Sequence, residues 1–169
     1  MAGTLDAVLT VDATPEDWTG IWRILRQVAA AGDTFCWPRD IAEQEARALW
    51  MLPRPNLPLV LRDEGGGILG TATLHPNQGG PAAHVANASF AVDPECRGRG
   101  VGRTLAVDTL ARARVEGYRA LQFNAVVEAN RGAVALWESL GFQILATVPE
   151  AFKHPSEGYV GLHIMYRAL

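Results

Sequence analysis

Three arginines and three glycines crowd into one short segment in the second half of the chain. The segment reads Arg97-Gly98-Arg99-Gly100-Val101-Gly102-Arg103-Thr104 and follows an apolar run that we interpret as a strand. Glycine lets main-chain N–H groups approach an anion, because no Cβ stands in the way. A helix start adds N–H groups without internal partners and a partial positive charge. The pattern therefore predicts a cradle for a diphosphate.

Two other phosphate-binding motifs fit the segment poorly. A Walker loop needs a lysine at the helix start, and the segment has none, which disfavours a nucleotide hydrolase. The dinucleotide fingerprint G-x-G-x-x-G, started at Gly98 and Gly100, needs glycine where Arg103 stands. Arg97, Gly100 and Gly102 instead match the pattern Q/R-x-x-G-x-G/A. A tight strand-to-helix turn with chance arginines is the simpler alternative, but it gives the glycines no purpose.

The Q/R-x-x-G-x-G/A pattern resembles the acetyl-CoA loop of the GCN5-related N-acetyltransferases, the GNAT superfamily. A second segment, NRGAVALWESLGF from Asn130 to Phe142, resembles the superfamily's N-x-x-A-x-x-L/F-Y-x-x-x-G-F motif. The resemblance is specific from about His84 to Phe142 and elsewhere follows only the order of elements. It implies acetyl-CoA as co-substrate and transfer of the acetyl group to the amine of a small molecule. A protein N-terminal or lysine acetyltransferase and a non-catalytic acyl-CoA-binding module remain alternatives.

The resemblance also implies where the cofactor binds. In this family two central parallel strands part, and the pantetheine arm lies between them like an added strand. A main-chain N–H near Phe90 or Ala91 would polarise the thioester carbonyl, and the amine would attack directly without an acyl-enzyme. The expected cofactor-binding residues are Phe90, Ala91, Val92, Arg97, Gly98, Arg99, Gly100, Val101, Gly102, Arg103, Thr104 and Asn130.

The catalytic acid and base are not assigned. Trp137 stands where the family often has a tyrosine, and an indole N–H does not release a proton at neutral pH. A thiol has a pKa of roughly 8.5, so the thiolate can leave unassisted. We interpret Trp137 as core or pocket wall, and Cys96 lies at the phosphate end, away from the acetyl group. For each candidate base a structural role is favoured over catalysis; the candidates are His75, His84, His154, Glu43 and Glu128.

Asn87 and Asn124 each interrupt an otherwise apolar strand. Asparagine is disfavoured in strands, and burying an unpaired amide costs about 1–3 kcal/mol. Because the two strands are successive members of one βαβ unit, we expect the side chains at similar depth. They either face one pocket, where neutral amides suit a carboxylate or an amide, or bond each other or a local bulge.

Four segments resemble one branch of the superfamily, that of the yeast acetyltransferases acting on L-azetidine-2-carboxylate, a proline analogue. The segments are His84-Val85-Ala86-Asn87, Gln122-Phe123-Asn124, Leu136-Trp137 and the run from Pro149 to Pro155. The resemblance implies that Asn87 and Asn124 bind an amino acid or a cyclic imino acid. It also suggests that a loop over 149–157 closes over the acceptor.

The elements that position these residues follow from hydrophobic periodicity and from turn signals. The predicted strands are 7–11, 57–62, 68–75, 84–92, 120–127, 142–148 and 158–167, and the predicted helices are 14–32, 40–50, 102–116 and 131–140. The strand–helix–strand unit from 84 to 127 requires a parallel pair. We therefore expect an α/β (α+β mixed) GNAT fold with a mostly antiparallel sheet of six to seven strands. The central parallel pair is splayed, and about four helices flank the sheet.

Composition limits the other function classes. A chain of 169 residues with 49% apolar residues fits a single domain over 1–169. The net charge of −3 argues against a nucleic-acid partner. The segment Met1–Asp6 lacks the features of a secretory signal, and no apolar run spans a bilayer, so we expect a cytoplasmic protein. Two cysteines form neither a disulfide framework nor a zinc site, and no metal is expected. Homodimers are common in the family.

Overall fold

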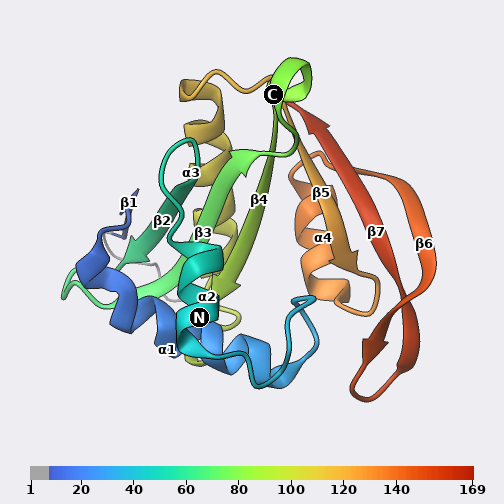
Figure 1. The fold of residues 1–169 in the computed structure, drawn as a ribbon, viewed down its shortest axis with the longest axis horizontal. Helices are drawn as coiled ribbons and strands as arrows, with labels where there is room; N and C mark the ends of the chain where they lie inside the picture. The colour runs from blue at the N-terminus through green and yellow to red at the C-terminus, as the bar shows by residue number, and fades with distance from the viewer. Residues whose placement is uncertain (1–7) are drawn as a thin grey trace.

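One mixed sheet of seven strands organises the chain, with strand order β1-β2-β3-β4-β5-β7-β6 (Figure 1). The computed structural model describes residues 8–169, so the segment Met1–Asp6 and the predicted strand start at Ala7 lie outside the described residues. Neighbouring strands are antiparallel except for β4 and β5. The predicted mixed, mostly antiparallel sheet is confirmed. The strands are β1 Leu9–Asp12, β2 Leu57–Arg62, β3 Ile68–Pro76, β4 Val85–Val92, β5 Ala120–Val127, β6 Gln143–His154 and β7 Gly158–Ala168.

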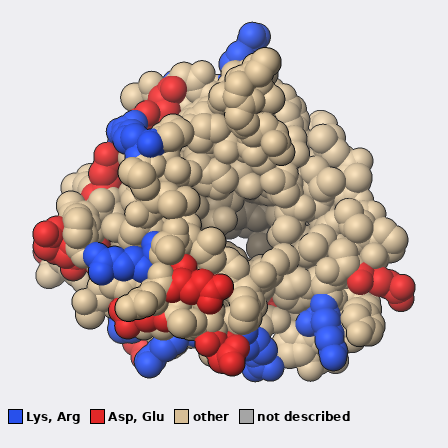
Figure 2. Space-filling model, viewed as in Figure 1, with Lys and Arg blue, Asp and Glu red and all other residues tan. Residues whose placement is uncertain are grey.

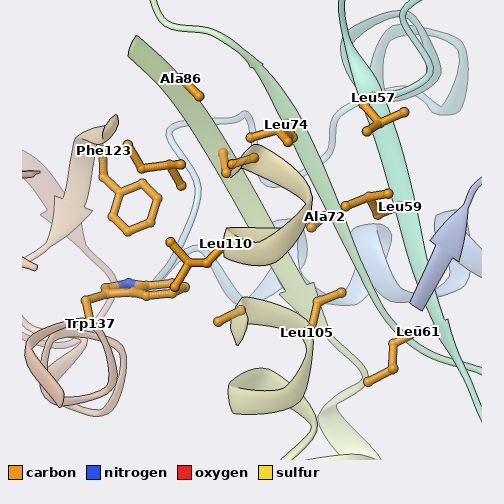
Figure 3. Close-up of a cluster of buried hydrophobic side chains, with 14 of the residues drawn as sticks. Leu57, Leu59, Leu61, Ala72, Leu74, Ala86, Leu105, Leu110, Phe123 and Trp137 are labelled. Atoms are coloured by element: carbon orange, nitrogen blue, oxygen red, sulfur yellow. The ribbon is translucent and has the colours of Figure 1, made fainter. Parts of the chain in front are cut away.

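Four α-helices cover the two faces of the sheet within the described range: α1 Trp18–Ala31, α2 Glu43–Trp50, α3 Val101–Val115 and α4 Arg131–Ser139. Helices α1 and α2 bury their apolar side chains with Val60 and Ala91 on one face. Helix α3 packs on the other face, where its Leu105 lies toward Ala72 and its Leu110 points toward Trp137 of α4 (Figure 3). Trp137 in turn lies beside Phe123. The sheet therefore separates two hydrophobic cores.

Helix α2 starts three residues later than predicted. The chain stays extended at Ala42 (φ −69°, ψ 145°) and the helix begins at Glu43, so the predicted start at Asp40 is wrong. Ile41, only 7% exposed, packs into the core beneath α1 and holds this stretch extended. The end of α1 is as predicted, because Gly32 adopts the left-handed conformation (φ 70°) that closes a helix.

The parallel strands β4 and β5 separate along their length. They are paired only at their first residues, with Val85 opposite Ala120 and Ala86 opposite Leu121. Figure 1 shows the two strands diverging from there toward their carboxyl ends. Strand β4 remains paired with β3, and β5 with β7. The predicted splayed central pair is confirmed, and a gap opens in the middle of the sheet.

The loop predicted over 149–157 is wrong. Strand β6 continues to His154, and only residues 155–157 turn before β7. A register shift between Val148 and Phe152, with a positive φ of 52° at Glu150, absorbs Pro149 as a bulge in the strand. Nδ1 of His154 accepts N–H groups of the turn at 3.2 and 3.3 Å. This segment is a hairpin arm rather than a loop that could close over an acceptor.

Candidate functional site

A cavity of about 650 Å³ passes through the gap between β4 and β5. Figure 2 shows the surface hollowed in the middle of the face on which α1 and α2 lie. On the α3 and α4 side the cavity is lined by Arg97, Gly102, Asn130, Ala133, Leu136 and Trp137. On the α1 and α2 side it is lined by Val28, Asp33, Thr34, Phe35, Cys36, Trp37, Asn87, Ser89 and Asn124. One cavity therefore connects both strand asparagines with residues 97–104, the predicted diphosphate cradle, which we call the phosphate loop.

The phosphate loop presents a row of N–H groups without partners. Gly98 (φ 75°) and Gly100 (φ 84°) both adopt the left-handed conformation, and Gly100 caps α3. Within residues 8–169, no hydrogen bond engages the main-chain N–H of Gly98, of Gly100 or of 101–103. The N–H groups of Arg97 and Arg99 instead bond Pro94 and Cys96, at 3.4 and 3.3 Å. Five of the expected donors are therefore free for an anion.

Side chains add charge around this loop. The loop residues 97–100 are exposed, and Arg97 lines the cavity. The Arg103 guanidinium donates to Ser139 Oγ of α4 at 2.7 Å, which ties the start of α3 to α4. Asn130 also lines the cavity, but its Oδ1 accepts Ala133 N–H at 3.2 Å, so it caps α4.

Strand β4 offers free main-chain groups to the gap at alternate residues. Hydrogen bonds from Asp93 N–H to Leu69 and from Asn77 N–H to Val85 show that odd-numbered residues of β4 bond β3. Even-numbered residues therefore face the gap. Of the three residues expected to contact the cofactor, Phe90 and Val92 direct their main-chain groups there. Ala91 pairs with β3 and lines the cavity without offering its N–H.

The α1–α2 loop forms the other end of the cavity, which the sequence reasoning did not anticipate. The rings of Phe35 and Trp37 pack at a tilt of 37° with their centroids 4.9 Å apart, and both contact Trp50 of α2. Trp50 is buried, and its indole N–H donates to Thr71 Oγ1 at 3.0 Å. The aromatic run between the two helices was the signal that could have pointed to this wall. The cluster anchors the loop and so holds Asp33 at the cavity.

Asn87 and Asn124 both line the cavity, but they do not bond each other. Oδ1 of Asn87 accepts Ala88 N–H at 2.8 Å. Asn124 instead joins Gln122 and Asn77 in a row of amides. Extending the β4–β5 register places Asn124 two positions farther along than Asn87, so their depths are similar but not equal.

None of the five candidate bases lines the cavity. Glu43 accepts the Trp18 indole N–H at 2.8 Å, and Glu128 accepts Gly161 N–H at 2.8 Å. The three histidines each have a ring nitrogen bonded to nearby main chain, namely His75 to Pro76, His84 to Pro81 and His154 to the turn after it. These hydrogen bonds give the five residues structural roles, and none of them lies at the cavity as a proton acceptor.

Two cysteines differ in their surroundings. Cys96 is buried beneath the phosphate loop, and Cys36 lines the cavity. Desolvation by neighbouring groups raises the pKa of the Cys36 thiol, which favours the protonated, less nucleophilic form. Neither position suggests an acyl-cysteine.

Trp137 forms both core and wall, as expected. It is 7% exposed, and its ring lies 4.7 Å from that of Phe123 and 4.8 Å from that of Phe90. In the part of the chain that the structure describes, no cluster of three metal-ligating side chains occurs. Likewise, no helix among the described residues is long and apolar enough to cross a membrane.

Comparison with known proteins places this architecture. A family model described as "Acetyltransferase (GNAT) family" matches residues 18–142. The chain belongs to the GNAT family. The match includes both the phosphate loop and the α4 motif, the two segments on which the resemblance rested.

Known relatives share the GNAT fold along the whole chain. A GCN5-related N-acetyltransferase from Kribbella flavida is 48% identical with a TM-score of 0.94, covering 98% of this chain and 100% of that one. A phosphinothricin acetyltransferase from Sinorhizobium meliloti, solved in complex with acetyl-CoA, is 22% identical with a TM-score of 0.83, covering 96% of this chain and 88% of that one.

A curated relative is the N-acetyltransferase aca1 of Schizosaccharomyces pombe, 34% identical over 113 residues. The match covers 66% of this GNAT chain and 54% of the yeast protein, so the chain matches about half the length of that relative.

Proposed function

We propose that this protein is an N-acetyltransferase that moves the acetyl group of acetyl-CoA to the amine of a small molecule. The observation that carries the proposal is the continuous cavity through the parted sheet. At one end lie five free N–H groups at a helix start, which suit a diphosphate. In the middle lie unpaired main-chain groups of β4, which suit the amides of a pantetheine arm.

The proposed cofactor contacts follow from this layout. Gly98, Gly100 and the N–H groups of 101–103 would bind the diphosphate, with Arg97 adding charge. Asn130 would form part of the opposite wall, and Val92 would pair with an amide of the arm. Phe90 N–H points into the gap and is the donor best placed to polarise a thioester carbonyl. Arg99, Arg103 and Thr104 complete the loop around the anion.

The reaction is a direct transfer. The acceptor's ammonium group first loses one proton to solvent, which leaves a neutral amine. The amine nitrogen then attacks the carbonyl carbon of the thioester, the C–S bond breaks, and the second proton of the nitrogen ends on the released thiol. Phe90 N–H would stabilise the negative charge that gathers on the carbonyl oxygen during attack. Trp137 stands where the family often has an acidic tyrosine and cannot protonate the thiolate. No acid is needed at that position, because a thiolate is a fair leaving group.

The acceptor end suits an amino acid or a cyclic imino acid. Asn87 has its oxygen occupied by Ala88 N–H, so its NH₂ group is what remains for a ligand. Asn124 likewise retains one N–H. These donors suit a carboxylate, while Asp33, on the same side, suits the acceptor's ammonium group. The resemblance to the azetidine-2-carboxylate branch supports this acceptor class.

A small acceptor fits the volume better than a protein substrate. The cavity of about 650 Å³ must hold both the pantetheine arm and the acceptor, within the range usual for small-molecule sites. The test is a titration with acetyl-CoA followed by a thiol-release assay over amino acids, simple amines and short peptides. Heat of binding with turnover of amino acids supports the proposal. Turnover of peptides alone would contradict it, and tight binding without any turnover would indicate a non-catalytic module.

We also propose that two copies of the chain associate through β6. This edge strand is exposed along nearly its whole length, and it carries Ile144, Leu145 and Val148 at 39%, 58% and 47% exposure. Unprotected apolar edge strands tend to pair with another chain. Sedimentation analysis should show a dimer, and Leu145→Lys should shift it to the monomer; a monomeric wild type would refute the pairing.

Because Cys36 and Cys96 are both free, we further propose a reducing, cytoplasmic location.

A further inference from the structure

Three amide side chains form a row beside the acceptor end of the cavity. Gln122 Nε2 donates to Asn124 Oδ1 at 2.9 Å, and Asn124 Nδ2 donates to Asn77 Oδ1 at 2.7 Å. Asn77 itself is held by its main-chain N–H, which donates to Val85 O at 2.8 Å. The row therefore runs from β5 to the segment after β3, across the point where β4 and β5 part. Of the three side chains, only Asn124 lines the cavity.

The row has a direction. Each side-chain amide has a carbonyl that only accepts hydrogen bonds and an NH₂ group that only donates them. Gln122 donates to Asn124, and Asn124 donates to Asn77, so both neighbours agree on how the Asn124 amide is turned. In this orientation one N–H of Asn124 remains for a ligand. Turning the Asn124 amide over, with Gln122 and Asn77 left as they are, would bring its NH₂ against the NH₂ of Gln122 and its oxygen against the oxygen of Asn77.

We infer that Gln122 and Asn77 are positioning residues that set the polarity of Asn124 and thereby select an acceptor bearing a carboxylate. This inference rests on the proposed function. An N–H held toward the acceptor attracts a carboxylate oxygen, whereas a carbonyl held there repels it. Gln122 and Asn77, which do not line the cavity, would therefore determine whether Asn124 presents its N–H or its carbonyl to the acceptor.

Two nearly isosteric substitutions separate the effect of the Asn124 amide orientation from the effect of an added negative charge. Glutamate at 122 can only accept, so Gln122→Glu draws the Asn124 NH₂ toward itself and turns the Asn124 oxygen toward the Asn77 NH₂. Aspartate at 77 also only accepts, so Asn77→Asp keeps the present orientation. Each variant adds one negative charge at one end of the same row. Any difference between them therefore reports the direction of the Asn124 amide rather than the added charge.

The experiment measures KM and kcat for L-azetidine-2-carboxylate and for its carboxamide, with the full chain and saturating acetyl-CoA. A panel of other amino acids, each with its carboxamide, is run alongside. We expect Gln122→Glu to raise the KM of the carboxylate acceptors by about tenfold or more relative to Asn77→Asp, since a hydrogen bond to a charged group is lost. The carboxamides, which can donate as well as accept, should differ by less than about threefold between the variants. The KM of acetyl-CoA should not change.

Each result decides a separate claim. Equal carboxylate KM values in the two variants, with an active wild type, would overturn the polarity inference and leave the proposed transferase standing. A wild type that acetylates simple amines but no amino acid would overturn the inference together with the amino-acid assignment. Thermal unfolding of both variants checks that they are folded, and a selective rise of carboxylate KM in Gln122→Glu supports the inference.

Discussion

Asp33 and Arg97 line the same cavity from opposite faces of the sheet, and among the described residues they are its two charged lining residues. Arg97 lies at the phosphate loop, and Asp33 lies just after the end of α1, where the helix dipole also favours a cation. The cavity therefore has a positive charge at the phosphate loop, which suits an anionic cofactor, and a negative charge at its other end, which suits an amine. This charge layout supports the proposed transfer from acetyl-CoA to an acceptor that carries an ammonium group.

Replacing Gly100 should abolish cofactor binding without unfolding the chain. Gly100 has a φ of 84°, and Gly117, at the far end of α3, has a φ of 85°. Valine at either position costs about 1–2 kcal/mol of backbone strain. Only Gly100→Val places a side chain at the anion cradle, so acetyl-CoA should give no heat on titration with it. Gly117→Val is the matched control and should bind normally. Intact binding by Gly100→Val would show that the loop is misassigned.

Removing the negative charge at the acceptor end should weaken the acceptor and spare the cofactor. Asp33→Asn should raise the acceptor KM by about tenfold, because the ammonium group loses its charged partner. Asp40 lies on the same segment, is exposed and does not line the cavity, so Asp40→Asn removes the same charge nearby. Steady-state kinetics of both variants test this. If Asp40→Asn raises the acceptor KM equally, the effect comes from the protein's overall electrostatic field rather than from a contact between Asp33 and the acceptor.

Trp137 should prove to be a wall and not an acid. Trp137→Phe keeps an aromatic ring against Phe123 and Phe90 but removes the indole N–H. We expect kcat within about threefold of wild type and an unchanged pH profile, with some loss of stability from the smaller ring. A large fall in kcat at unaltered stability would mean that the indole N–H takes part in the chemistry.

Much of this architecture could be predicted from sequence because the decisive signals are local. Glycines at Gly32 and Gly100 adopt left-handed conformations that end or start helices, and β2 and β5 have the predicted bounds. The 149–157 segment was missed because proline usually ends a strand, whereas here the β6–β7 hairpin pairing of Phe152 with Val160 continues it beyond the bulge. The cavity wall at Phe35 and Trp37 has a local signal, the aromatic run between α1 and α2, but its place at the cavity depends on tertiary contacts with Trp50 of α2.

The site residues divide in the same way. The free N–H groups after Gly98 follow from a helix start that the sequence displays. The orientation of Asn124 depends on Asn77, which is 47 residues away along the chain and comes close only through the fold. In the sequence Asp33 looks like an ordinary loop residue. It lies at the cavity because α1 ends at Ala31, shortly before it.

A stability test far from the site checks the fold itself. Asp17 is 6% exposed and pairs with Arg62. Burial alone would raise the pKa of the Asp17 carboxyl, but Thr14 N–H and the Arg62 guanidinium outweigh it, so the pKa is lowered in the folded state. A lowered folded pKa stabilises the protein above the unfolded value near 3.9, and this contribution disappears as the pH falls through the folded value.

Asp17→Asn should therefore lower the free energy of unfolding by about 1–3 kcal/mol at pH 7. The gap to wild type should narrow as the pH drops below about 4. Urea denaturation at several pH values measures it, with acetyl transfer at pH 7 as a check that the site is intact. A gap that stays constant down to pH 3 would contradict the ionic origin.

The most direct test of the whole account is a crystal structure with coenzyme A bound. We predict that the diphosphate accepts hydrogen bonds from the main chain of Gly98, Gly100 and 101–103, with the pantetheine arm between β4 and β5 and the sulfur near Phe90. Density for the diphosphate away from the start of α3, or an arm that lies outside the gap, would contradict the account.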